Sequence, residues 1–198
     1  MCCRYYMGDY DPEEAMEAYY AEAQRHADAV GLSVVSSGEV RPTNIAPVIA
    51  LNAKNREPGA FPMKWGFTYP ARDVLIFNIR SETAEYKPMF AASAKERRCL
   101  IPATNYFEWK KAGKEKIKYA ICPKNGPLYM AGLYFRLPSE KLPCFSILTM
   151  DASGGLEAIH NRMPVMIPQS GISDWLSIER PFREAIKPSI VEMNFIPA

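Results

Sequence analysis

Cys2 offers two nucleophiles on one residue, the α-amine and the thiol, once Met1 is removed. Their reference pKa values, about 7.7–8.0 and about 8.5, give each a nucleophilic form near neutral pH. An aldehyde can form a Schiff base with such an amine and then close through sulfur to a thiazolidine, because that closure is intramolecular. Cysteine is small enough for methionine aminopeptidase to act before it, so we expect Cys2 to begin the mature chain. The alternative is an inert terminal residue, since free cysteine usually packs as a small hydrophobe.

Two other side chains are candidates for proton transfer. Glu108 stands between aromatic residues in Tyr106-Phe107-Glu108-Trp109, where partial desolvation would raise its pKa toward that of a useful general acid. Strand alternation also allows Glu108 to lie on a solvated face. His160 follows the Gly154-Gly155 turn and precedes a predicted strand, which is a common place for sites, although many such histidines are structural.

A polar run, Asn78-Ile79-Arg80-Ser81-Glu82-Thr83, ends another apolar segment. It combines an amide, a guanidinium and a carboxylate, and its alternative interpretation is an ordinary polar strand end. The five cysteines are odd in number and lack the paired spacing of zinc ligands or of a redox pair, so we expect reduced thiols. No metal or organic cofactor is expected.

The chain alternates one long helical pattern with many short strand patterns. Apolar spacing predicts a helix from about Pro12 to Val30. A short helix is predicted at Ser173–Ser177, and Ala112-Gly113-Lys114 predicts a hairpin turn. The predicted strands are Pro47–Leu51, Leu75–Ile79, Cys99–Ile101, Asn105–Trp109, Lys116–Ile121, Leu128–Phe135, Cys144–Met150 and Met163–Ile167. This order favours an α+β fold, mainly antiparallel, over βαβ units.

Composition bounds the function. The 198 residues are 48% hydrophobic and 23% charged, which predicts a folded domain of residues 1–198. A net charge of +2 is too mild to indicate general nucleic-acid binding, so any DNA site must be local. No signal peptide or run of about 18 apolar residues is seen, so we expect a cytoplasmic protein without a membrane contact.

Together these segments resemble the SOS response-associated peptidase (SRAP) family of abasic site processing proteins, over nearly the whole chain. The residues that carry the resemblance are Met1-Cys2-Cys3-Arg4, Pro42-Thr43-Asn44-Ile45-Ala46-Pro47, Trp65-Gly66, Asn78–Thr83, Arg98–Ala103, Tyr106-Phe107-Glu108-Trp109 and His160-Asn161-Arg162-Met163-Pro164. Each segment is short, but their order and spacing together are specific.

The resemblance implies a barrel-like sheet with peripheral helices and a covalent reaction. Cys2 would form a thiazolidine with the ring-opened abasic sugar in single-stranded DNA and so shield the lesion during the SOS response. Asn78 would orient Cys2, Glu108 would shuttle protons, and His160 would hydrogen-bond the opened sugar. The residues implied in DNA binding are Arg4, Arg80 and Arg162 for phosphates, and Pro42, Trp65 and Trp109 for stacking or wedging against bases.

The resemblance also leaves points open. The family carries a peptidase or hydrolase classification, and lyase activity is a further expectation. Binding at single-strand/duplex junctions is also expected. The protein is expected to be a monomer that associates with the nucleoid when bound to DNA. Cys3 stands where the family usually has glycine, and Asn105-Tyr106 and Thr68-Tyr69 depart from the commonest pattern. Two alternatives remain: a cysteine (auto)peptidase that uses Cys2, and a non-catalytic single-stranded DNA-binding module in which Cys2 is inert.

Overall fold

The computed structural model describes residues 3–8, 14–69, 73–186 and 192–198. Cys2, and the predicted helix start at Pro12, lie outside these described residues. No helix among them is long and apolar enough to cross a membrane.

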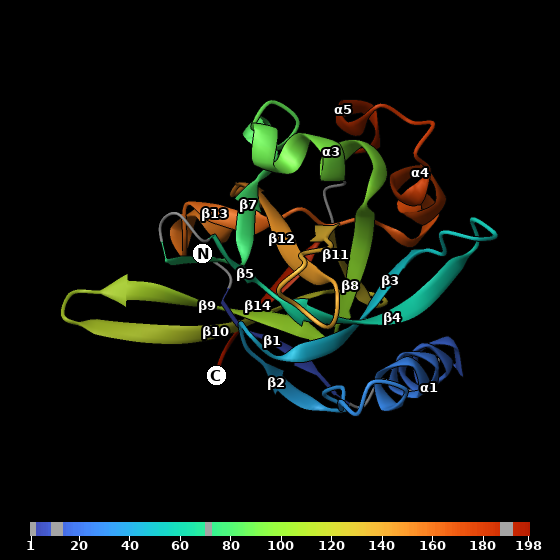
Figure 1. Cartoon of the computed structure of the whole chain (residues 1–198). Helices are drawn as coiled ribbons and strands as arrows, with labels where there is room; N and C mark the ends of the chain where they lie inside the picture. Colours follow the sequence, from blue (N-terminus) through green and yellow to red (C-terminus); the bar gives the residue numbers. More distant parts are fainter. Residues whose placement is uncertain (1–2, 9–13, 70–72, 187–191) are drawn as a thin grey trace.

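A five-stranded antiparallel sheet contains the N-terminal strand. Its order is β14-β10-β9-β1-β2, and its strands are β1 (Tyr5–Met7), β2 (Gly38–Val40), β9 (Asn105–Ala112), β10 (Glu115–Pro123) and β14 (Met193–Pro197). The predicted hairpin is confirmed, because Ala112 pairs with Glu115 across a turn in which Gly113 has a φ of 65°, a conformation that glycine tolerates. The hairpin projects from the body of the molecule (Figure 1).

A second sheet, of seven strands, closes partway into a ring. Its order is β11-β8-β3-β4-β12-β13, and β7 adds to β12. The further pairing of β11 with β12 joins five of the strands in a ring and leaves β13 and β7 outside it. Only the pairings of β12 with β4 and β7 are parallel among the described pairs. The strands are β3 (Ile45–Leu51), β4 (Pro58–Trp65), β7 (Asn78–Arg80), β8 (Arg98–Ala103), β11 (Leu128–Phe135), β12 (Cys144–Asp151) and β13 (Arg162–Pro164). The predicted antiparallel, barrel-like α+β class is therefore confirmed.

The helices lie around these sheets. Helix α1 (Glu14–Asp28) packs Ala23 and Ala27, four residues apart on one face, against Ala60 of β4. The short helices near one end of the ring are α2 (Ser81–Ala84), α3 (Pro88–Glu96), α4 (Ile172–Leu176) and α5 (Phe182–Ala185), and the 3-10 turns are η1 (Leu156–Ala158) and η2 (Gln169–Gly171). Figure 1 shows α1 beside β4 and α3, α4 and α5 gathered at the opposite end.

Some predicted strands are corrected by the structure. Leu75–Ile79 divides into β6 (Val74–Ile76), which pairs with β5 (Phe67–Tyr69), and β7, which pairs with β12. The predicted strand Met163–Ile167 is shorter, because regular pairing ends at Pro164, although Met166 makes an isolated bridge to Met130.

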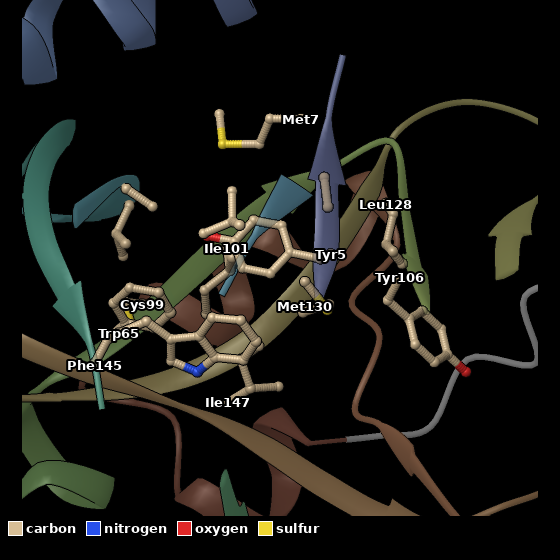
Figure 2. Packing of buried hydrophobic residues seen from close by; sticks show 14 of the residues in the cluster. Tyr5, Met7, Trp65, Cys99, Ile101, Tyr106, Leu128, Met130, Phe145 and Ile147 are labelled. Atoms are coloured by element: carbon tan, nitrogen blue, oxygen red, sulfur yellow. The ribbon is translucent and has the colours of Figure 1, made fainter. Parts of the chain in front are cut away.

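Trp65 and Trp175 are the largest fully buried side chains among the described residues, and Trp65 lies in the core beside β1. Its ring is 0% exposed, lies 6.1 Å from that of Phe145 at an angle of 7°, and donates a hydrogen bond from Nε1 to the carbonyl oxygen of Phe77 at 2.9 Å. Figure 2 shows it packed with Tyr5 and Phe145. The expectation that Trp65 stacks on DNA bases is therefore wrong, since its ring has no exposed surface.

We expect Trp65→Phe to lower the free energy of unfolding by about 2–4 kcal/mol, because it removes buried ring surface and leaves the Phe77 carbonyl without its indole donor. Urea denaturation followed by circular dichroism measures this change. The control is Tyr86→Phe at a position that is 61% exposed, which should shift the midpoint little. Equal stability of the Trp65→Phe variant and the wild type would contradict the packing described above.

Candidate active site

A pocket of about 370 Å³ lies where the N-terminal strand, the β9–β10 hairpin and the segment before β13 meet. Its described lining residues are Cys3, Arg4, Glu108, Trp109, Lys111, Lys116 and His160. The structure thus brings together four residues that the sequence singled out: Arg4, Glu108, Trp109 and His160. Cys2 precedes this lining directly in sequence and lies outside the described residues.

Strand pairing places the N-terminal segment beside Glu108. The backbone N–H of Phe107 donates to the carbonyl oxygen of Arg4 at 2.9 Å, and Tyr5 pairs with Tyr106. Both tyrosines are fully buried, so this register is held by core packing as well as by hydrogen bonds. Cys3 and Arg4, the described residues before β1, therefore line the same pocket as Glu108, which follows Phe107 in β9.

Glu108 is a buried carboxylate. Its side chain is 3% exposed and its neighbour Phe107, which points to the other side of β9, is 7% exposed. The alternative of a solvated face for Glu108 is therefore wrong, because both faces of β9 are covered at this point. A carboxylate in such a place can exchange protons with a ligand while bulk water is largely excluded.

Cys3 is half-buried on the same wall. Burial of its thiol, followed by the negative charge of Glu108, raises the pKa of Cys3 above its ordinary value of 9.0, although the charge of Arg4 opposes the rise. The Cys3 thiol therefore stays protonated at neutral pH. A protonated thiol is a poor nucleophile, so Cys3 is held in its less reactive form.

His160 is fixed by the turn that precedes β13. Its backbone N–H donates to the carbonyl oxygen of Leu156 at 2.9 Å, and its ring Nδ1 accepts from the backbone N–H of Arg162 at 3.0 Å. Because Nδ1 is an acceptor, the neutral ring carries its proton on Nε2. His160 can thus offer an N–H donor to a molecule in the pocket.

Arg162 joins two of the sequence motifs. Its guanidinium donates to both oxygens of Glu82 at 2.7 and 2.9 Å, to Asp151 at 2.6 Å and to the carbonyl oxygen of Thr149 at 2.7 Å. It is only 8% exposed. The expected contact of Arg162 with phosphate is therefore not what the structure shows: this guanidinium is occupied by carboxylates and holds β13, and with it His160, against α2.

Arg4 lies at the edge of the pocket in a cationic group. Its guanidinium pairs with Glu39 at 3.0 Å and lies 5.4 Å from the ring centre of Trp109. Glu39 also pairs with Arg41 and Lys118 at 2.8 and 3.2 Å. Burial raises the pKa of Glu39, but hydrogen bonds from Arg41 and Lys118 outweigh it, so the net pKa is lowered. One carboxylate thus serves three cations, which leaves this edge positive.

Lys111 and Lys116 were not singled out by the sequence. They face each other directly across the β9–β10 hairpin and both line the pocket. Like charges at directly opposed positions destabilise a strand pair, so this arrangement favours an anion bound between them. The predicted hairpin turn contains the signal for this pair, because the residues two positions before and two positions after a two-residue turn lie opposite each other.

The remaining predicted residues do not belong to the described lining of this pocket. Asn78 begins β7, is half-buried and pairs with Ile147 of β12. Arg80 ends the same strand and is exposed, and Pro42 is half-buried in the turn between β2 and β3. Among the described residues, no cluster of histidine, cysteine, aspartate or glutamate is arranged to hold a metal ion.

The fold and this pocket define a class of protein. The model of the SOS response associated peptidase (SRAP) family matches residues 1–194, and the chain belongs to this family. The chain is similar to "Abasic site processing protein YobE" of Bacillus subtilis, with 35% identity over 71% of this chain and 70% of that protein. It is also similar to "Abasic site processing protein YedK" of Escherichia coli, with 31% identity over 78% and 72% of the two chains.

Solved structures support the fold. A crystal structure of a protein from Bordetella bronchiseptica, 22% identical, superimposes with a TM-score of 0.77 and covers 100% of this chain and 99% of its own. A protein from Bacteroides thetaiotaomicron, 23% identical, gives a TM-score of 0.75 over 98% and 90% of the two chains. At these identities the likeness shows the fold alone.

The Arg162–Glu82 pair should make the free energy of unfolding depend on pH. The hydrogen bond from Arg162 lowers the pKa of Glu82 below its ordinary 4.5, although burial opposes this. A carboxylate whose pKa is lowered by folding stabilises the fold at pH values above its pKa in the unfolded chain. This contribution is lost as the pH falls through its pKa in the folded protein. We expect Glu82→Gln to cost about 1 kcal/mol near neutral pH, since Glu82 is 45% exposed, and to flatten the loss of stability in acid.

Urea denaturation between about pH 3 and 7 measures this dependence. The matched control is Glu85→Gln, whose carboxylate pairs with the exposed Arg183. Parallel acid profiles of wild type and the Glu82→Gln variant would show that the pair does not supply the predicted pH dependence.

Proposed function

We propose that this chain captures abasic sites in single-stranded DNA as a covalent thiazolidine on Cys2 and shields them during the response to DNA damage. Relatives named abasic site processing proteins support the substrate class. The observation that carries the proposal is the buried Glu108 carboxylate, which shares a pocket with His160 and with the residue that follows Cys2. The proposed working unit is a monomer of one domain, residues 1–198.

The proposed reaction balances without a cofactor. The free α-amine of Cys2 adds to the aldehyde carbon of the ring-opened sugar and forms a carbinolamine. Loss of its hydroxyl as water gives a Schiff base, and the Cys2 sulfur then adds to the same carbon while the nitrogen gains the proton of the thiol. One C–N bond and one C–S bond replace the C=O bond, and one water molecule leaves.

Glu108 and His160 supply the proton transfers in this proposal. The Glu108 carboxylate takes the proton that the nitrogen loses after the amine has added to the aldehyde, and returns it to the departing hydroxyl. The Nε2–H of His160 donates to an oxygen of the opened sugar, because its Nδ1 is occupied by the backbone of Arg162. Asn78, on β7, would orient Cys2, as the sequence resemblance implies.

DNA binding in this proposal uses the cations around the pocket. Arg4, Lys111 and Lys116 line it and would contact phosphates beside the lesion, and the exposed Arg80 would extend this contact. Trp109 offers a half-buried ring for base stacking, and Pro42 a wedge. Arg162 would act indirectly, by positioning His160.

Covalent capture is tested on single-stranded DNA that carries one abasic site, resolved on a denaturing gel. We expect the wild type to give a shifted band, Cys2→Ala to give none, and Glu108→Gln to form the product about 100-fold more slowly, the scale of a lost general acid or base. Cys3→Gly is the matched control, because its thiol is held protonated, and it should keep the wild-type rate.

Two outcomes would contradict the proposal. Native binding with no shifted band in the wild type would favour the non-catalytic DNA-binding module. A band that survives Cys2→Ala would place the reactive group on another residue.

The lysine pair of the hairpin gives a separate prediction. We expect Lys111→Gln with Lys116→Gln to weaken binding of undamaged single-stranded DNA and to reduce the slope of log affinity against log salt by about 1.4, which is about 0.7 for each lost phosphate contact. Fluorescence anisotropy over a salt series measures the slope. Lys87→Gln with Lys124→Gln removes equal charge from exposed positions outside the pocket and is the control. An unchanged slope in the hairpin variant excludes the pair as phosphate ligands.

A further inference from the structure

Two neighbouring pockets, of about 400 and 310 Å³, lie on a different part of the molecule. They share the lining residues Leu51, Ala53 and Tyr134 and have no lining residue in common with the candidate active site. Their walls come from the β3–β4 hairpin, the ends of α3 and α4, and the end of β11. Figure 1 shows α4 and the β3–β4 hairpin on the right and the β9–β10 hairpin on the left.

These pockets concentrate positive charge. Their lining holds six cations against two carboxylates, Glu96 and Glu179, whereas the whole chain has a net charge of only +2. The cations, here called the second basic face, are Lys54, Arg56, Lys95, Arg97, Arg98 and Arg136. Within the described residues, none of the six forms an ion pair, although cations elsewhere on the surface do.

Arg97 and Tyr134 are fixed relative to each other at the centre of this face. The Nε of Arg97 donates to the hydroxyl of Ser93 at 3.0 Å, and that hydroxyl donates to the Tyr134 carbonyl at 2.9 Å. The backbone N–H of Tyr134 in turn donates to the Arg97 carbonyl at 2.9 Å. The Arg97 guanidinium and the Tyr134 backbone are therefore held in place before any ligand binds.

Other arginines gather around the same ring. Burial, and then Cys99, raises the pKa of the Tyr134 hydroxyl, whereas the positive charges of Arg136, Arg97 and Arg56 oppose that rise. Three guanidinium groups thus act on one half-buried tyrosine. This combination of an aromatic ring and guanidinium groups is typical of surfaces that bind single-stranded nucleic acids.

Arg98 adds a buried charge to the wall. Its guanidinium donates to the carbonyl oxygens of Ala94, Ser177 and Arg180 at 2.8, 3.1 and 2.8 Å. Neutral carbonyl groups satisfy its donors without cancelling its charge, so the pocket beside it keeps a positive potential. That potential favours an anionic ligand.

We infer that the second basic face binds another segment of single-stranded DNA, with phosphates on Arg56, Arg97 and Arg136 and a base against Tyr134. Guanidinium groups suit phosphate geometry, and the cations line two adjoining pockets rather than one, which suits a strand rather than one small anion. The second pocket adds the stacked rings of His26 and Phe61, 5.5 Å apart. This inference does not depend on thiazolidine chemistry.

Native mass spectrometry with undamaged oligothymidylate of about ten nucleotides tests the inference, since this length fits one binding face. We expect two strands on each wild-type chain and one strand on the Arg56→Gln, Arg97→Gln, Arg136→Gln triple variant. The matched control, Lys87→Gln with Lys124→Gln and Arg183→Gln, removes equal charge from exposed positions outside both faces and should bind two. Arg136→Glu alone, at an exposed position, should weaken the second binding event about tenfold.

A single bound strand on the wild type, or two on the triple variant, would overturn the inference. Circular dichroism of each variant shows that it is folded, and the single Arg136→Glu variant leaves the Arg97–Ser93 bond untouched. Failure of covalent capture at an abasic site would refute the proposed reaction and leave this stoichiometry unchanged, so the two failures are distinguishable.

Discussion

The pairing of β1 with β9 determines where the candidate site forms. β1 has only three residues, yet it lies between β2 and β9, and its Tyr5 is buried in the core beside Trp65, with the ring centres 5.1 Å apart. The bond from the Phe107 N–H to the Arg4 carbonyl then sets Arg4 next to Glu108. A slip of one residue would exchange the buried and exposed sides of β1 and remove this alignment.

Carboxylates play two different parts around the pocket. Glu82 and Glu39 are each paired with cations: Glu82 orders the segment that carries His160 through Arg162, and Glu39 organises Arg4 and Lys118. Glu108 lies instead in the lining of the candidate pocket. The position of each carboxylate, rather than its residue type, therefore separates the structural roles of Glu82 and Glu39 from the proton-transfer role proposed for Glu108.

Local patterns predicted much of the fold, and tertiary environment explains what they missed. The hairpin was predicted from the turn that contains Gly113, and the long helix from its helical spacing. Strand β4 was not predicted, because it contains Pro58 and Pro62, whose missing N–H groups argue against a strand. In the site, the aromatic flanks of Glu108 predicted its desolvation. The neighbouring residues in sequence did not show that Trp65 is buried and Trp109 partly exposed, because the exposure of each ring depends on strands distant in sequence.

The wide separation of β1 and β9 along the chain has a consequence for synthesis. Tyr106 is made about 100 residues after Tyr5, which takes on the order of 5–20 s on a ribosome. During that interval β1 can pair only with β2, and an isolated two-stranded pair is marginal in water. β1 therefore remains without its β9 partner until that strand emerges, so the five-stranded sheet can form only after more than half of the chain has been made.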